Sequence, residues 1–140
     1  MNIGESEMII FMLGIIAGGA SYLVTQLWMN PILLYLEIRH QITSDLVFYA
    51  NVINAVGLND EMQSRHRERL EKNRKHAAEI RAISYRLPFW YKWCLRLRNE
   101  CPVSASKALI GLSNSDEYNS ANAFVERLRI SLGIPESIES

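Results

Sequence analysis

Three histidines and two cysteines are the side chains best suited to metal binding or nucleophilic chemistry: His40, His66, His76, Cys94 and Cys101. On one helix, His66 and His76 would lie nearly three turns apart, so they could share a face but could not chelate one ion. The cysteines lack the paired spacing of a zinc site, and in a reducing compartment both are expected to be ordinary buried thiols. A disulfide bridge between them stays open but has no support in the sequence. We predict no metal site and no cofactor.

Motifs of enzyme active sites are also missing from the sequence. It contains no phosphate-binding loop, no GxGxxG fingerprint and no Gly-x-Ser-x-Gly nucleophile elbow. Two acidic pairs, Asp60-Glu61 and Asp116-Glu117, fall at predicted helix starts, where the helix dipole explains them without acid–base chemistry. The sequence therefore predicts a protein that is not an enzyme.

A different kind of chemistry is carried by residues 88–98, PFWYKWCLRLR. If this segment is helical, its aromatic residues fall on one side and its basic residues lie toward another, which is the layout of a helix lying among lipid headgroups. Two other roles stay open: the tryptophans could fill the core of the domain, or the segment could contact nucleic acid. We predict that five of its residues contact the membrane surface: Phe89, Trp90, Lys92, Trp93 and Arg96.

Charge is concentrated along the chain, although the formal net charge is zero. Residues 65–98 hold eleven Lys and Arg against three acidic residues, a local balance of +8. Such a block could sense an anionic ligand such as a nucleotide or a nucleic acid, with an affinity that falls steeply as salt rises. A membrane effector that responds to such a ligand is therefore the alternative function.

The longest apolar run is residues 8–29, MIIFMLGIIAGGASYLVTQLWM, which holds no charged side chain. At the helical rise of about 1.5 Å per residue it spans roughly 33 Å, enough to cross the ~30 Å hydrocarbon layer of a bilayer. A buried core helix explains it less well, because apolar runs in soluble cores are usually shorter. A cleaved signal peptide also explains it less well, because Glu5 and Glu7 precede the run and no basic residue does. We expect a retained membrane anchor.

The placement of basic residues predicts the orientation of this anchor, because cytoplasmic flanks are enriched in Lys and Arg. No basic side chain precedes the run, whereas Arg39 and the block at 65–98 follow it. We expect a short extracytoplasmic tail at 1–7, the transmembrane helix at 8–29, a cytoplasmic domain at 30–135 and a flexible tail at 136–140.

Small residues form a ridge inside the apolar run. Gly14 and Gly18 make a GxxxG pattern, and Ala17 and Ser21 extend it. Glycines at this spacing let two helix backbones approach closely in lipid. Because glycine is common in membrane helices, an incidental pattern is the alternative. We predict self-association of the anchor through this face.

Helical patterns continue through the rest of the chain. A helix is expected to begin at Asn30-Pro31 and to end near Gly57. Its apolar stripe would comprise Leu36, Ile42, Leu46, Tyr49, Ile53 and Val56. A second membrane crossing over 42–58 is unfavourable, because a central Asp45 costs roughly 2.5–3.5 kcal/mol there.

The next helix is expected to start after Asn59 and to end before Pro88. Two shorter helices follow at 103–112 and 116–132, and Gly133 is a stop signal. Either Ser104 or Ser106 would cap the first of these helices, and three of its apolar residues should be buried: Leu109, Ile110 and Leu112. The predicted fold is all-α, with one transmembrane helix followed by a small helical domain that contains a long helical hairpin.

Two short strings, FYANVI at 48–53 and LIGLSNS at 109–115, accompany the N-terminal anchor. In this combination the chain resembles small uncharacterised bacterial membrane-anchored proteins over most of its length. The resemblance implies a bacterial inner membrane, and it implies no activity, ligand or partner.

Together these features predict a single-pass inner-membrane protein that acts as an interaction or scaffold module. The expected partners are the lipid bilayer, further copies of the chain and a cytosolic protein. Nucleotide or nucleic acid is the less favoured partner.

Overall fold

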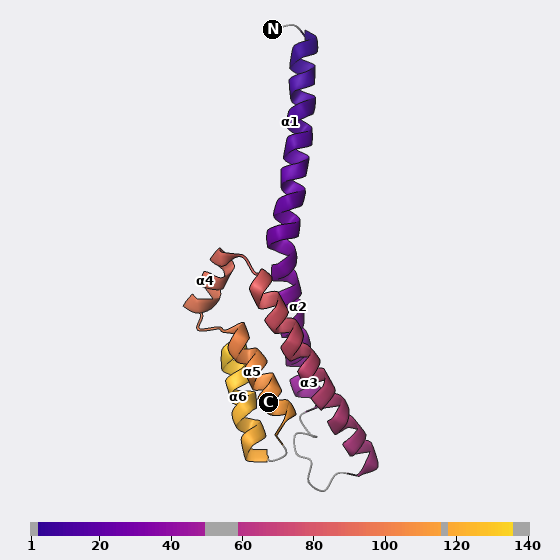
Figure 1. Cartoon of the computed structure of the whole chain (residues 1–140), viewed down its shortest axis with the longest axis vertical. Coiled ribbons are helices and arrows are strands. Elements are labelled where there is room, and N and C mark those ends of the chain that lie inside the picture. Colours follow the sequence, from indigo (N-terminus) through magenta and orange to yellow (C-terminus); the bar gives the residue numbers. More distant parts are fainter. Residues whose placement is uncertain (1–2, 50–58, 116–117, 136–140) are drawn as a thin grey trace.

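The computed structural model describes residues 3–49, 59–115 and 118–135, and in these ranges the regular structure is helical, without a strand. This agrees with the all-α prediction. Figure 1 shows α1 projecting as a long rod from a body that the other helices form. The elements in chain order are α1 (Ile3–Val24), the π-helical turn η1 (Thr25–Met29), α2 (Asn30–Phe48), α3 (Asp60–Arg86), α4 (Phe89–Leu97), α5 (Pro102–Ser113) and α6 (Tyr118–Leu132).

Helix α2 begins at the predicted Asn30-Pro31, but Asn30 does not cap a separate helix, because α1 continues through η1 into α2 without a break. Pro31 has no N–H to donate to the Leu27 carbonyl, and its ring would crowd that carbonyl in an α-helix. The wider π turn accommodates the proline: the Asn30 N–H donates to the Thr25 carbonyl, five residues back. A proline that normally starts a helix is here tolerated inside one.

The predicted apolar stripe is confirmed in part: Ile42 and Tyr49 are buried and Leu46 packs against the core, whereas Leu36 does not belong to the buried side. Tyr35, Ile38 and Ile42 are at most 7% exposed, whereas Leu36 is 41% exposed. Leu36 follows Tyr35 and therefore points about 100° away from the buried face. The helix ends at Phe48, and the predicted continuation through Ile53 and Val56 to Gly57 lies outside the described residues.

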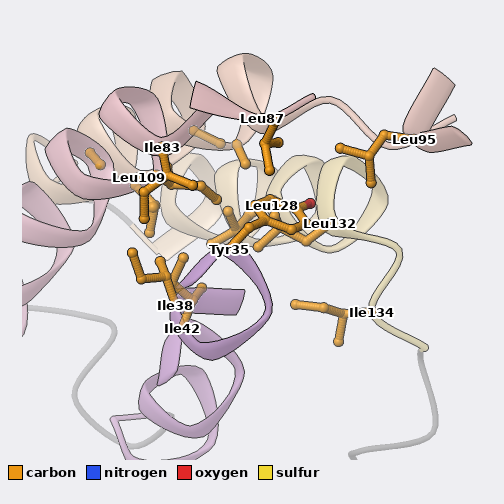
Figure 2. Packing of buried hydrophobic residues seen from close by; sticks show 14 of the residues in the cluster. Tyr35, Ile38, Ile42, Ile83, Leu87, Leu95, Leu109, Leu128, Leu132 and Ile134 are labelled. Atoms are coloured by element: carbon orange, nitrogen blue, oxygen red, sulfur yellow. The ribbon is translucent and has the colours of Figure 1, made fainter. Parts of the chain in front are cut away.

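Helix α3 has the predicted limits. The Asn59 side chain caps its start by accepting a hydrogen bond of 2.9 Å from the Met62 N–H, and the helix ends at Arg86, before Pro88. Helix α3 contacts both α2 and α5, and α5 in turn contacts α6. The core therefore lies between these four helices, as Figure 2 shows from close by.

Small side chains bring α3 and α5 close together. Ala77, Ala105 and Ala108 are at most 1% exposed, and the buried Ser106 hydroxyl donates to the Ala77 carbonyl at 2.9 Å. Ser106 is therefore occupied in the helix contact, and the cap predicted at Ser104 or Ser106 is wrong. Helix α5 begins with Pro102, without a side-chain cap bond; proline is favoured in the first turn because it has no N–H to satisfy there.

The contact between α5 and α6 requires a glycine. A Cβ on Gly111 would overlap the Phe124 ring. Leu109 and Leu112 are buried as predicted, but Ile110 is 44% exposed, since it lies about 100° from the buried face. Helix α6 ends at the predicted stop, Gly133, with a left-handed φ of 61°.

Candidate functional site

The apolar N-terminal helix buries none of its hydrophobic window in the rest of the described chain. Ser6–Phe48 contains one stretch long and apolar enough to cross a membrane, and 0% of that stretch is buried. Large side chains such as Phe11 and Ile16 are 69% and 64% exposed. Helix α1 is therefore exposed on all sides, and its apolar window does not pack against the described body.

The predicted ridge of small residues lies together on one side of this helix. Among the described residues, no atom lies within 4 Å of where a Cβ on Gly14 or Gly18 would stand, apart from the helix's own backbone. The Ser21 hydroxyl donates to the Ala17 carbonyl at 2.8 Å. Because the serine bonds within its own helix, the ridge exposes no unsatisfied hydroxyl donor to apolar surroundings.

The π turn sets how this ridge is oriented relative to the body. The π turn contains one residue more than an α-helical turn, so side-chain directions in α2 are shifted by about 100° around the helix axis relative to those of an uninterrupted α-helix. With this shift, Gly14 aligns with Leu33 on the exposed side of α2, and the buried side of α2 that contains Tyr35 lies roughly opposite. The ridge of α1 therefore faces away from the body.

The second predicted surface, on α4, is also exposed. Phe89, Trp93 and Leu97 recur every four residues and are 85%, 61% and 65% exposed. The five predicted contact residues together line a shallow, open groove of about 450 Å³: Phe89, Trp90, Lys92, Trp93 and Arg96. The alternative that the tryptophans fill the core is wrong: Trp90 and Trp93 are exposed, and the inward side of α4 is formed by buried Leu95 and half-buried Tyr91.

Helix α4 is fastened to α2 by an aromatic contact. The Tyr91 ring meets Tyr35 edge to face, with 6.0 Å between the ring centroids. Burial raises the pKa of both phenols, and the Glu100 carboxylate raises it further.

A buried carboxylate fixes the segment that follows α4. Glu100 has a side chain 2% exposed, lies 2.7 Å from the Arg98 guanidinium and 4.0 Å from that of Arg39. Arg39 also donates to the Gly133 carbonyl at 2.9 Å. The end of α4 is thereby tied to α2 and to the end of α6.

The basic block at 65–98 divides into two parts with different surroundings. In α3, acidic neighbours lie beside many of the cations, as in the pairs Arg65–Glu61, Lys72–Glu68 and Lys75–Glu79. From residue 80 to residue 99 the chain has five basic residues and no acidic one. Arg98 is paired with Glu100, so four basic residues without an ion pair among the described residues lie at the end of α3 and on α4: Arg81, Arg86, Lys92 and Arg96.

A polar cluster between α2 and α3 could not be predicted from sequence spacing. His76 Nε2 lies 2.9 Å from an Asp45 carboxylate oxygen, and Lys72 Nζ lies 3.7 Å from the other oxygen. These residues line an open cleft of about 360 Å³. The sequence does contain a series of polar residues at helical spacing along one side of α3, and all four are at most 7% exposed: His66, Arg69, Asn73 and His76. The series does not show that Asp45 of α2 lies opposite it. Burial lowers the pKa of the Arg69 guanidinium.

His40 is exposed and lines the same cleft as His76, whereas the two cysteines lie elsewhere. Cys94 and Cys101 are free and exposed, so the prediction of buried thiols is wrong: Cys94 lies on α4 and Cys101 precedes α5. In the part of the chain that the structure describes, no group of three or more His, Cys, Asp or Glu could hold a metal ion. Comparisons with protein-family models, with curated proteins and with solved structures found no match.

Proposed function

We propose that this protein is a membrane-anchored interaction module that self-associates through α1. In this proposal residues 8–29 cross a bacterial inner membrane once, and residues 30–135 form a cytoplasmic scaffold domain. The observation that carries the proposal is the bare ridge around Gly14 and Gly18, which η1 turns away from the body. Two copies could pack these ridges together, and their bodies would lie on the outer sides of the pair.

The exposed side of α2 would extend such a pairing beyond the membrane. Leu33, Glu37, His40 and Ser44 are exposed and lie within about 40° of the Gly14 direction once the π turn is counted. Helices α2 and α3 would then act as the two arms of a long helical hairpin, with α2 toward the partner copy and α3 toward the core. A cytosolic protein partner would bind the remaining body surface.

A membrane two-hybrid assay on the full chain tests the association. We expect Gly14→Leu with Gly18→Leu to weaken self-association several-fold, because two leucines would hold the backbones apart. Gly19→Leu is the matched control, because Gly19 also has open space around it but points about 140° away from Gly14. Unchanged association in the double variant would sink the proposal.

The alternative function, sensing of a nucleotide or nucleic acid by the basic block, has less support. Three of the basic residues of α3, Arg65, Lys72 and Lys75, form ion pairs with Glu61, Glu68 and Glu79. Such pairs reduce the field that would attract a phosphate chain.

A further inference from the structure

The orientation of α4 is the reverse of an ordinary surface helix. A helix on a soluble body turns its apolar stripe inward, yet the stripe of Phe89, Trp93 and Leu97 points away from the core. Contiguous apolar surface of this kind, bordered by polar residues, marks a contact with a partner or a membrane. Helix α4 therefore has an apolar side that no residue described by the structure covers.

The position of α4 along the molecule indicates which partner covers that side. Its Tyr91 contacts Tyr35, six residues after Met29, where the uncharged run ends. Six residues correspond to about 9 Å along a helix axis. Figure 1 shows α4 beside the junction of α1 and α2. If α1 crosses a bilayer, α4 lies at the depth of the lipid headgroups.

The positions of the tryptophans also indicate that α4 lies at the depth of the lipid headgroups. The sequence has three, Trp28, Trp90 and Trp93. Trp28 lies next to the end of the uncharged run, and the other two lie on α4. Because indole rings favour the membrane–water interface, a common level for all three is the arrangement of an aromatic belt.

Charge decides which lipid fits. Arg81, Arg86, Lys92 and Arg96 form no ion pair with any residue that the structure describes. Lys92 is held near the surface by donating to the Tyr85 carbonyl at 3.2 Å, and Arg96 is exposed beside the apolar stripe. Cations flanking an apolar, aromatic stripe complement a surface with negative phosphates above acyl chains.

We propose that α4 docks on anionic phospholipid at the same bilayer surface from which α1 emerges. This inference rests on the proposed function, because it takes α1 to be in the membrane. Tyr91, Leu95 and Glu100 hold α4 on the body, so docking fixes the whole body against the bilayer. Self-associated anchors would then present their bodies in one fixed orientation.

Quenching of tryptophan fluorescence by lipids with brominated acyl chains can report membrane contact of the anchor and of α4 independently. In the full chain, Trp28→Phe leaves Trp90 and Trp93 as reporters of α4, and Trp90→Phe with Trp93→Phe leaves Trp28 as the reporter of the anchor. Each variant is reconstituted into vesicles of phosphatidylcholine and into vesicles of phosphatidylcholine mixed equally with phosphatidylglycerol.

We expect Trp28 to be quenched in both lipids, and Trp90 and Trp93 to be quenched at least twice as strongly in the anionic vesicles. Adding Lys92→Glu and Arg96→Glu should remove this anionic preference. Arg67→Glu is the matched control: it reverses an exposed charge on α3, about 30 Å along the helix from the start of α4, and should leave quenching unchanged.

The outcomes distinguish the two proposals. If Trp28 is quenched but Trp90 and Trp93 are not, docking of α4 is wrong and the anchor stands. If Trp28 is not quenched, the membrane anchor itself is wrong. Equal quenching of α4 in both lipids would overturn the anionic preference. A response of Trp90 and Trp93 to a mixed-sequence oligonucleotide, with none to lipid, would make α4 a nucleic-acid surface instead.

Discussion

Helices α1 and α2 are two parts of one continuous rod, yet they are built for different surroundings. In α1, Ile16 is 64% exposed, and the apolar window that includes it has 0% of its residues buried. In α2, Ile42 is 1% exposed and packs in the core with Tyr35. The same residue type is thus exposed in α1 and packed in the core of the body in α2.

The difference lies in the distribution of polar residues around the helix. Residues 8–29 contain no charged side chain, so no side of this helix is suited to face water. In α2 the polar residues Glu37, His40 and Ser44 occupy one side and Tyr35 and Ile42 the other. A helix that is apolar on all sides requires lipid or other apolar helices around it. An amphipathic helix can pack its apolar side on its own domain and expose its polar side to water.

The largest effect on stability is expected from α2. Ile42→Ala should lower the free energy of unfolding by about 2–5 kcal/mol, because it leaves a cavity between α2 and the core. Ile16→Ala, the same change in α1, should alter the free energy of unfolding by less than about 0.5 kcal/mol, because the Ile16 side chain is exposed and packs against no described residue of the body. Denaturant unfolding of the full chain in detergent, followed by circular dichroism, measures both. Equal losses from the two variants would contradict the division between α1 and α2.

A smaller effect, visible in alkaline solution, is expected from Tyr35. Its hydroxyl is buried and has no hydrogen-bond partner among the described residues, and burial raises its pKa. The unfolded chain therefore loses the phenolic proton first, and the free energy of unfolding falls as pH rises above about 10. Tyr35→Phe should reduce that fall and, near neutral pH, should leave stability within about 1 kcal/mol of the original or raise it.

Unfolding measured as a function of pH checks this prediction. Tyr22→Phe is the control, because Tyr22 is a tyrosine of α1 and 64% exposed. A decline in alkaline solution that Tyr35→Phe leaves unchanged would contradict the assignment.

The smallest effect on stability is expected from the turn that joins the two helices. Deleting Gln26 from η1 should convert the π turn to an α-helix, rotate α1 by about 100° relative to the body, and leave body stability unchanged. Cross-linking reports the rotation. With Cys94 and Cys101 replaced by serine, we expect Leu33→Cys to cross-link copies in membranes and the Gln26 deletion to reduce this cross-link. Cross-linking that does not respond to the deletion would remove the role assigned to η1.

The helix types and most helix ends were predictable from local signals. The Asn59 cap, Pro88 and Gly133 mark their helix boundaries by side-chain or backbone properties that act within one turn. The exposure of Gly14 and Gly18 also followed from the surrounding apolar run. Such features need no knowledge of what packs against them.

Features that depend on contacts distant in sequence were not predictable. Asp45 and His76 are 31 residues apart, and only the packing of α2 on α3 brings them to 2.9 Å. The sequence left a core role open for Trp90 and Trp93, because an amphipathic pattern does not indicate which side of a helix faces inward. Asn30 and Pro31 mark the start of α2 correctly, but they do not indicate that α1 runs into it, because the π turn that joins the two helices has no sequence signature of its own.

Energy transfer between donor-labelled and acceptor-labelled copies of the full chain, reconstituted together in lipid vesicles, tests the central claim most directly. We predict efficient transfer for the original sequence and for Gly19→Leu, and transfer reduced to that of randomly mixed, non-interacting proteins for Gly14→Leu with Gly18→Leu. Equal transfer in all three proteins, or none in the original, would contradict self-association through this face of α1.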